Sequence, residues 1–547
     1  MTMRTLPVDA STVLVELPGL DEVLALRSSL TTQPLDGIEE MVPAARTLML
    51  RFDPARLSVG TIGEALSQRD LMAWRAASGA AQGPLVEIPM RYDGEDLAEV
   101  AALAGLQVAE VIRRHQQSEF VVAFCGFAPG FAYLIGGDPA LQVPRRATPR
   151  AQVPAGSVAL GGACCGVYPR ATPGGWRLIG TTDKKLWDAD RDPPALLTPG
   201  ARVRFRDATV GVAVEADPSS PRPTTVRRSA SEARSTGPRL EVAAMMMPAL
   251  LQDLGRPGHA HLGVAPSGAA DRAALQAANR AVGNPPGSAC LEIALGNAAF
   301  SCPAGGPGGV VVAFAGAPAP IGVQRASGEI FEGVPGQPIA LGPGDSLKVG
   351  HPARGLRTYL AVRGGFDVPR ALGSASRDTL AALGPMPVAR GAVLRVASPD
   401  ATPLDTVTAD PPRAGLPGDA AQRPPLPASG ETVVLDISLG PRAERFTAEA
   451  VALLGDQDWQ VTPQSSRIGL RLRGDRPLAQ REATELPSEG VVRGAVQVPH
   501  DGQPVLLLAD HPLTGGYPVI AVVAAHHLDL AGQIPPGARV RFRRMPG

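Results

Sequence analysis

The octapeptide PGARVRFR occurs twice in the chain, at residues 199–206 and again at residues 536–543. A Gly-Gly-aromatic turn lies upstream of each copy, in TPGGWRLIG at 172–180 and in LTGGYPVIA at 513–521. Two motifs that recur together in the same order indicate a duplicated structural unit. Beyond His115, short apolar runs are separated by Gly and Pro about every ten residues, a rhythm typical of β-barrels and β-sandwiches. We therefore expect duplicated β-barrel modules, with a small-molecule site in the cleft between them.

The chain has 547 residues, which at roughly 100–200 residues per domain predicts three or four domains. Two Pro-rich stretches lack apolar periodicity and are predicted to be linkers. The expected fold class is mainly β, with an α+β N-terminal subdomain and multiple β-barrels. The expected boundaries are 1–85 for the α+β subdomain, 86–216 for a barrel, 217–239 for a linker, 240–398 for a further barrel, 399–430 for a linker and 431–547 for the last barrel.

Charge, hydropathy and cysteine usage narrow the class of protein. Lys plus Arg and Asp plus Glu both number 52, so we expect no nucleic-acid partner, because such a partner needs a basic surface. No apolar run approaches the 18 or so residues of a membrane-spanning helix, so we expect no membrane association. The five cysteines include no CxxC pair, which favours a reducing compartment and predicts cytoplasmic localisation.

Aromatic residues and arginines gather in the first predicted barrel. The aromatics flank a Gly- and Pro-rich loop, where they can wall a flat ligand. The arginines lie in a Pro-stiffened loop, which suits forked binding of a carboxylate, carbonate or phosphate. The alternative is ordinary turn chemistry with solvated arginines. The candidate substrate-binding residues of this segment are Phe127, Phe131, Arg145, Arg146, Arg150 and Trp176.

Polar residues are also spaced through the Gly-rich loops of the later segments. Those of the middle segment suit a polar planar ligand, although a capped helix over a barrel mouth explains them equally well. Those of the last segment combine arginine with carboxylates, which suits either general-base catalysis or a structural ion pair. The candidate substrate-binding residues here are Gln252, Asp253, Arg256, Ser267, Asp271, Arg467, Gln497, Thr514, Gly515, Gly516 and Tyr517.

Three residues, His115, Glu489 and Asp510, are candidates for acid–base catalysis. His115 follows a predicted helix and precedes a predicted strand, where a surface or capping role is the alternative. Glu489 and Asp510 could each act as a general base, and the competing interpretation for each is a structural ion pair.

No metal site is expected. The HxH pair His259 and His261 lacks an accompanying cluster of ligands with metal-site spacing. The neighbours His526 and His527 are expected to point to opposite faces of a strand.

Several motifs of known chemistry do not occur in the sequence. It contains no GxxxxGK[ST] phosphate loop and no GxSxG nucleophile elbow. It also contains no Met-Lys-Met biotinylation sequence. The chain therefore cannot carry its own biotin, and we expect any ATP-dependent activity to require a second protein.

Long motifs in both halves resemble two related families. GFAPGFAYL, PRRATPR, VPAGSVAL and PGGWRLIGTT, between residues 126 and 182, resemble the allophanate-hydrolase-subunit-1 family. QDLGRPGH, SGAADRAAL, YLAVRGGF, SEGVVRGAVQVP and TGGYP, in the second half, resemble its subunit-2 partner. These families include the B and C components of 5-oxoprolinase and the carboxyltransferase region of urea carboxylase and urea amidolyase. The chain thus resembles a natural fusion of the B and C components.

The resemblance implies cyclophilin-like β-barrels in both halves and action alongside other chains. It implies the B–C component of an ATP-dependent 5-oxoprolinase, an amide or lactam hydrolase that opens 5-oxoproline to glutamate. The implied partner is the A component of 5-oxoprolinase, of the LamB/YcsF family, without which the chain would be inactive. ATP is the implied cofactor, bound by the complex, and the substrate a small amide or lactam. Homo-oligomerisation is compatible with the sequence.

The same resemblance leaves two alternatives open. The first is the carboxyltransferase component of a urea or amide carboxylase, with biotin supplied in trans rather than attached to this chain. The second is a regulatory binding protein similar to the kinase-inhibitor pair of spore formers. The absence of biotin carrier, biotin carboxylase and amidase regions in the sequence favours the 5-oxoprolinase interpretation.

Overall fold

The computed structural model describes residues 3–78, 83–146, 148, 150–208, 237–305, 308–397, 424–482 and 486–545. Most of the predicted linkers 217–239 and 399–430 lies outside these described residues. The predicted fold class is confirmed, because the chain is mainly β, with an α+β subdomain at its N-terminus and a closed and a nearly closed β-barrel.

The N-terminal subdomain is a four-stranded antiparallel sheet with helices on one face. Its elements are β1 (Arg4–Asp9), β2 (Thr12–Glu16), α1 (Leu20–Thr32), β3 (Ile38–Pro43), β4 (Thr47–Phe52), α2 (Val59–Ser67) and α3 (Leu71–Ser78). The strand order is β1-β2-β4-β3. Alternation along the strands divides the apolar side chains: Val13 and Leu48 pack with the helices, whereas Leu14 and Met49 face the other way. Both faces of this sheet are therefore covered.

A nearly closed seven-stranded barrel follows. Its elements are β5 (Leu85–Met90), α4 (Leu97–Ala104), α5 (Val108–Gln117), β6 (Phe120–Cys125), β7 (Ala132–Ile135), η1 (Pro139–Leu141), β8 (Arg150–Val153), β9 (Ser157–Gly161), β10 (Cys164–Val167), β11 (Thr172–Gly174), β12 (Arg177–Thr181) and β13 (Arg202–Asp207). Its strand order is β12-β9-β10-β7-β6-β13-β5, and β8 and β11 form a separate ribbon. A bridge between Arg91 and Thr181 links the two ends of the sheet.

The last part of the chain forms a closed barrel. Its elements are β25 (Thr432–Leu439), η5 (Ala443–Arg445), α7 (Ala448–Asp456), β26 (Trp459–Val461), β27 (Gly469–Arg473), β28 (Glu489–Gly490), β29 (Ala495–Gln497), β30 (Val505–Leu507), β31 (Thr514–Gly515), β32 (Val519–Val523), η6 (Ala525–His527), α8 (Leu528–Ala531) and β33 (Arg539–Arg544). The barrel order β25-β32-β29-β30-β27-β26-β33 repeats the order of the first barrel, strand for strand.

The repeated octapeptide occupies the same place in both barrels. Arg202 of β13 pairs in parallel with Leu85 of β5, and Arg539 of β33 pairs in parallel with Thr432 of β25. The duplicated modules expected from the sequence are therefore present, and positions in one barrel can be matched to positions in the other through the strand register.

Residues 239–397 form a two-sheet sandwich, where the sequence predicts a further barrel. Its elements are β14 (Arg239–Met245), β15 (Leu250–Gln252), η3 (Ala260–Leu262), α6 (Arg272–Ala281), β16 (Cys290–Ala294), β17 (Ala298–Ser301), β18 (Val310–Gly316), β19 (Ile321–Gln324), β20 (Ile330–Gly333), β21 (Ile339–Leu341), β22 (Ser346–Val349), β23 (Arg357–Val362) and β24 (Val393–Arg395). The sheets are β20-β19-β22-β17-β14-β24 and β15-β16-β23-β18-β21, with one apolar core between them. The prediction differs because barrels and sandwiches share the same rhythm of short strands and turns.

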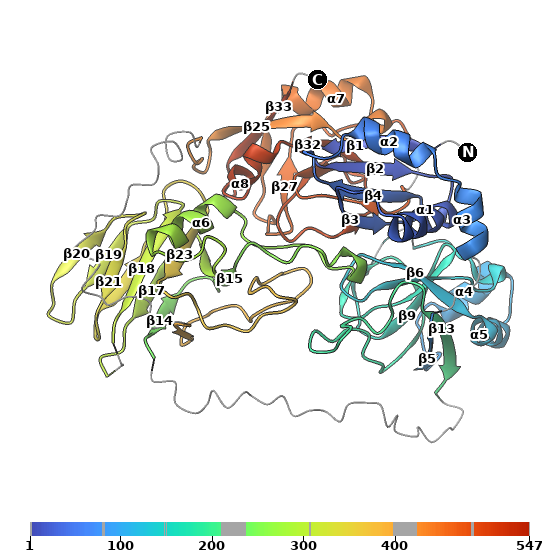
Figure 1. Cartoon of the computed structure of the whole chain (residues 1–547), viewed down its shortest axis with the longest axis horizontal. Coiled ribbons are helices and arrows are strands. Elements are labelled where there is room, and N and C mark those ends of the chain that lie inside the picture. The colour runs from blue at the N-terminus through green and yellow to red at the C-terminus, as the bar shows by residue number, and fades with distance from the viewer. Residues whose placement is uncertain are drawn as a thin grey trace.

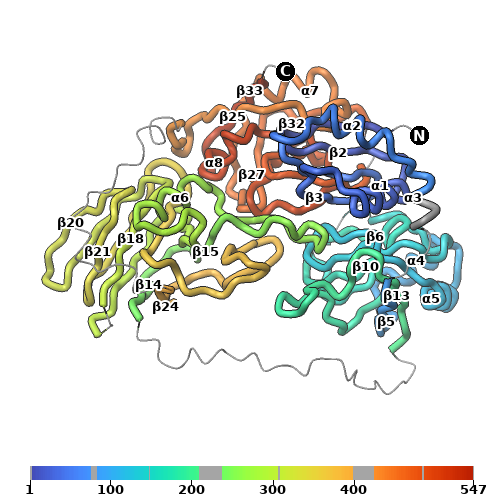
Figure 2. Tube along the Cα trace, in the orientation of Figure 1, coloured from blue at the N-terminus to red at the C-terminus, as the bar shows by residue number. Residues whose placement is uncertain are grey.

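The parts pack so that segments far apart in the sequence meet. The N-terminal subdomain lies beside the C-terminal barrel (Figure 1), and Leu14 and Met49 of the former share an apolar cluster with Leu507 and Val522 of the latter. The Cα trace shows a long segment of the middle part reaching from the sandwich toward the first barrel (Figure 2), where Leu262 packs with residues of that barrel. Among the described residues, no helix combines the length and the apolar character that crossing a membrane requires.

Candidate functional site

His115, a predicted catalytic residue, lies in the core of the first barrel. It is 0 % exposed, its ring lies 4.6 Å from the ring of Phe205, and its Nδ1 is 2.9 Å from the Tyr92 hydroxyl. Burial lowers the pKa of His115 to about 3, so it is neutral at physiological pH. The register places Leu454, a core leucine of α7, at the same position in the second barrel. We therefore propose a packing role for His115 in place of the catalytic role expected from the sequence.

The predicted aromatic wall is a closed aromatic cluster. The ring of Phe131 lies 5.2 Å from that of Tyr168 and 5.5 Å from that of Trp176, and Tyr133 lies 5.5 Å from Trp176. Phe131 and Trp176 are 2 % and 6 % exposed. These rings pack edge to face against one another, and the burial of Phe131 and Trp176 favours a role in the core of the barrel. Phe127 lies at the edge of the cluster and is half-buried.

The predicted anion-binding arginines meet a carboxylate of the chain itself. Asp96 accepts hydrogen bonds from Arg146 Nη1 at 2.9 Å and from Arg150 Nη2 at 2.8 Å, and from the backbone N–H of Leu178 at 2.7 Å. Burial alone would raise the pKa of Asp96, but the hydrogen bonds from Arg150 and Leu178 outweigh it and hold that pKa below its usual value. The third arginine, Arg145, lies over the ring of Trp176 at 5.8 Å. An external anion is not needed to explain this loop.

The second barrel contains the same ion pair with its charges exchanged. Arg150 lies opposite Gly174 in the β8–β11 ribbon, and Glu489 lies opposite Gly515 in the β28–β31 ribbon. The partner of Glu489 is Arg442, whose Nε donates to Glu489 Oε2 at 2.9 Å. The backbone N–H groups of the loop partners bond equivalent strand carbonyls, Asp96 to Leu178 and Arg442 to Val519.

This repetition favours the structural ion pair as the role of Glu489. In both barrels, an ion pair joins the loop that follows the barrel's first strand to the two-stranded ribbon. The acidic and basic residues have exchanged places between the two barrels. Burial raises the pKa of Glu489, partly offset by Arg442. Arg442 also pairs with Glu16 of the N-terminal subdomain at 2.9 Å, so the pair holds that subdomain against the barrel. We therefore propose a structural role for Glu489 in place of the catalytic role expected from the sequence.

Arg467 is the centre of a buried polar network between the sandwich and the second barrel. It is 6 % exposed. Its Nε donates to Asp510 Oδ2 at 2.9 Å and its Nη2 to Asp510 Oδ1 at 3.0 Å. Its Nη1 donates to Glu292 Oε1 at 2.6 Å, and its Nη2 also donates to the carbonyl of Gly268. Buried charges require such pairing, and here the pairing joins two domains.

The predicted residues Ser267 and Asp510 belong to this network. Ser267 Oγ donates to Asp510 Oδ1 at 2.6 Å, and Thr379 donates to Asp510 Oδ2 through its hydroxyl at 2.7 Å and its backbone N–H at 2.9 Å. Burial alone would raise the pKa of Asp510, but Arg467 outweighs it and holds that pKa below its usual value. Asp510 is therefore ionised and saturated with donors.

A loop of the sandwich, residues 371–384, reaches this network and is organised by Asp253. Asp253 accepts hydrogen bonds from the hydroxyls of Ser374 and Ser376 at 2.6 and 2.5 Å. Gln252 donates to the carbonyl of Arg377 at 2.8 Å. Arg256 donates to the carbonyls of Ala371 and Ser376, whereas its buried Nη1 has no hydrogen-bond partner among the described residues.

The loop also brings in Asp378, which sequence reasoning missed. Asp378 is 1 % exposed, and the charges of Asp510, Arg256 and Arg467 act on it. Arg170 of the first barrel interacts electrostatically with Asp378 and donates a hydrogen bond to the carbonyl of Leu380. The loop thus meets both barrels. We call this meeting point, formed by residues 253–256, 267, 371–384, 467 and 510, the three-domain junction.

Backbone strain marks the same region. Of the six described non-glycine residues in the left-handed region, which such residues rarely adopt, Ser267, Leu372 and Ala382 lie at the junction with φ values of 54°, 51° and 53°. Phe127 of the first barrel has a φ of 65°, and the other two, Leu295 and Asn297, lie in a turn of the sandwich. Such strain costs about 1–3 kcal/mol per residue and concentrates at functional sites. The loop of Phe127 contacts the second barrel directly, since its backbone N–H donates to Thr514 Oγ1 at 3.2 Å.

The remaining predicted residues lie around the junction in supporting positions. Asp271 caps α6 by accepting from Ala274 N–H at 2.8 Å. Gln497 Nε2 donates to the carbonyl of Tyr517 at 3.1 Å, and Gln497 Nε2 lies 2.5 Å from where a Cβ on Gly515 would be. A larger residue at that position would have to displace the Gln497 amide. Gly516 continues this turn, and the ring of Tyr517 is 39 % exposed.

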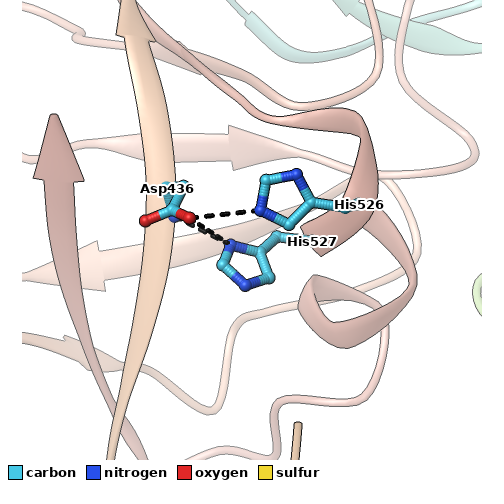
Figure 3. A group of neighbouring side chains, drawn as sticks. All are labelled: Asp436, His526 and His527. Carbon is cyan, nitrogen blue, oxygen red and sulfur yellow. Dashed lines mark hydrogen bonds and ion pairs between the residues drawn. The ribbon is translucent and has the colours of Figure 1, made fainter. Parts of the chain in front are cut away.

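A group of two histidines and one aspartate, Asp436, His526 and His527, lies on the second barrel (Figure 3). The histidines occupy the turn η6, not the strand expected from the sequence. Asp436 Oδ2 lies 3.1 Å from His526 Nε2, and Arg543 Nε donates to Asp436 Oδ1 at 2.6 Å. The backbone N–H of Asp436 donates to His527 Nδ1 at 2.8 Å. Because this bond occupies the lone pair of His527 Nδ1, the group is explained by its internal hydrogen bonds.

A cleft of about 600 Å³ opens on the second barrel between α7, β25 and β33. The residues that line it include the apolar Val434, Ile437 and Val451 and the charged Arg541 and Arg543. None of the residues that line it is among those predicted from the sequence. It lies apart from the three-domain junction.

Known proteins match the chain in two parts, one toward the N-terminus and one toward the C-terminus, as the sequence motifs do. In the first comparison, 205 residues are 42 % identical to the B subunit of 5-oxoprolinase from Escherichia coli O157:H7, covering 36 % of this chain and 90 % of that protein. In the second, 308 residues are 31 % identical to the C subunit of 5-oxoprolinase from Escherichia coli strain K12, covering 55 % of this chain and 90 % of that protein. One chain thus contains relatives of two separate proteins.

Two other relatives extend the comparison. Urea amidolyase of Lachancea kluyveri is 32 % identical over 308 residues, which cover 53 % of this chain and 16 % of that protein. The crystal structure of TTHA0988 superimposes with a TM-score of 0.76 at 35 % identity, covering 99 % of this chain and 100 % of that one. The family described as "Carboxyltransferase domain, subdomain C and D" matches residues 3–197, and "Carboxyltransferase domain, subdomain A and B" matches residues 262–544. The chain belongs to the carboxyltransferase domain family, with subdomains C and D preceding subdomains A and B.

Proposed function

We propose that the chain is the B–C component of an ATP-dependent 5-oxoprolinase, which opens the lactam ring of 5-oxoproline to give glutamate together with a separate A component. The observation that carries the proposal is the presence of both 5-oxoprolinase relatives in one chain, each matched over 90 % of its length. The packing of the N-terminal subdomain against the second barrel supports it, because this contact joins the two halves.

The three-domain junction is the proposed reaction site. 5-Oxoproline carries one carboxylate and one planar amide, so its binding calls on a cation and on hydrogen-bond donors. Arg256 Nη1 is buried without a partner among the described residues and suits the substrate carboxylate. A buried, water-poor setting strengthens such contacts. We propose ATP as the cofactor of the complex, with its phosphates held by the A component. The five free cysteines support a cytoplasmic setting.

Reconstitution tests this function. The purified chain should not consume 5-oxoproline with ATP by itself, whereas addition of the A component should give glutamate, ADP and phosphate. Leaving out ATP, or replacing 5-oxoproline by urea, are the matched controls. Turnover by the isolated chain would contradict the need for the A component, and no turnover in any combination would contradict the substrate.

A carboxyltransferase component for urea or a related amide is the second candidate. It is favoured by the match to urea amidolyase and by the family description. In this alternative a biotin carrier supplies biotin in trans, and carboxylated biotin would be consumed when the chain and an amide are added. Biotin-independent hydrolysis of 5-oxoproline separates the first candidate from the second.

A further inference from the structure

The carboxylates at the three-domain junction differ in how many donors they accept. Asp510 accepts from Ser267, Thr379 and Arg467. Asp253 accepts from two serine hydroxyls and from the backbone N–H groups of Ala375 and Gly255. A carboxylate with its lone pairs filled in this way has no capacity left for a proton.

Asp378 is the exception. Its Oδ1 accepts from the backbone N–H of Ala381 at 2.7 Å, and its Oδ2 accepts from no donor among the described residues. Its backbone is fixed, since its N–H bonds the carbonyl of Leu383 at 2.9 Å. The side chain is therefore held in place with one oxygen available.

Charged groups from all three parts of the molecule surround Asp378. Asp510 and Arg467 face it from the second barrel, Arg256 from the sandwich and Arg170 from the first barrel. None of the three arginines forms an ion pair with it among the described residues. Burial and the charge of Asp510 raise the pKa of Asp378 to about 6, whereas Asp510 stays ionised. Two carboxylates whose environments separate their pKa values divide the acid and base roles between them.

We propose that Asp378 is the general acid–base of the junction, a role that we first expected of His115, Glu489 or Asp510. This assignment rests on the proposed lactam hydrolysis. The Asp378 carboxylate takes one proton from the water whose oxygen bonds to the lactam carbonyl carbon. The same proton passes to the ring nitrogen as the carbon–nitrogen bond breaks. Asp378 ends as it began, and this step consumes one water molecule; the ATP that the complex spends is hydrolysed by a second water, which releases ADP and phosphate.

Asp378→Asn, Asp378→Glu and the exposed control Asp367→Asn test the assignment. In the complex with the A component, Asp378→Asn should lower kcat by about 100-fold or more, the usual contribution of general acid–base catalysis, with KM little changed. The wild-type rate should rise with pH through a limb near pH 6, and this limb should disappear in Asp378→Asn. Asp378→Glu should keep the limb at a reduced rate, and Asp367→Asn should match the wild type.

A second measurement on the free chain keeps the two proposals separable. Infrared difference spectra between pH 5 and pH 8 should show a buried carboxyl group that titrates, and Asp378→Asn should lack this signal. If the signal persists in Asp378→Asn, or if this variant keeps the wild-type rate and pH limb, the assignment is overturned. If the wild-type complex does not act on 5-oxoproline at all, the proposed function fails, and the infrared titration still decides whether Asp378 holds the exchangeable proton.

Discussion

Replacing Arg467 with alanine should loosen the contact between the sandwich and the second barrel. The change removes the bonds to Asp510 and Glu292 and to the carbonyl of Gly268. It leaves Asp510, which is 0 % exposed, without its bidentate cation. Removing one partner of a buried ion pair costs about 3–5 kcal/mol, which is a large fraction of the roughly 5–15 kcal/mol that stabilises a domain.

Urea unfolding and limited proteolysis measure this loss. Arg471→Ala is the matched control, because Arg471 lies on the same strand β27 with its side chain exposed, and it should change stability by less than about 0.5 kcal/mol. The double variant Arg467→Met with Asp510→Asn should recover part of the loss, since it leaves no unpaired charge at this position. If the free energy of unfolding of Arg467→Ala lies within about 1 kcal/mol of the wild-type value, the network is not what joins the two domains.

The contacts of Asp378, His115 and the two ribbon ion pairs each give a further prediction. Because the folded pKa of Asp378, about 6, exceeds the reference value of 3.8, the folded chain binds more protons between these values and its stability falls as pH rises through this window. The free energy of unfolding of Asp378→Asn should therefore exceed that of the wild type by up to about 3 kcal/mol at pH 8, and should equal it below pH 4. Urea unfolding at pH 8 and below pH 4 measures this difference. His115→Leu, which reproduces the Leu454 position of the second barrel, should keep activity and change stability by no more than about 1 kcal/mol; a lost reaction rate with an intact fold would restore His115 as a catalyst. Arg150→Ala and Glu489→Ala should each lower stability by about 1.5–3 kcal/mol, because each breaks a charged hydrogen bond, and should leave KM unchanged; a raised KM at unchanged stability would return them to the substrate site.

The barrels were predictable because their signal is local and repeated. The octapeptide and the Gly-Gly turn mark the same strands in both modules, β13 and β33. Over the middle segment the same rhythm of short strands forms a sandwich, since strand spacing does not record whether the first and last strands pair. The sequence pattern thus predicts strand content better than sheet closure.

The site was predictable only in part, for a physical reason. Arg467, Asp510 and Ser267 were named as candidates and lie together, but the pairing of Arg150 with Asp96 joins residues whose types alone do not reveal a partner. Asp378 lies in a loop without periodicity, and its character comes from Asp510 and Arg256, which are distant in the sequence. Signals of this kind exist only in the folded chain.

The most direct test of the site is a structure of the chain in complex with the A component and 5-oxoproline. We predict that the ligand lies at the three-domain junction, with its carboxylate hydrogen-bonded to Arg256 and its ring nitrogen next to Asp378. Binding instead in the cleft between α7 and β33, or at the arginines that pair with Asp96, would contradict the assignment of the junction as the reaction site.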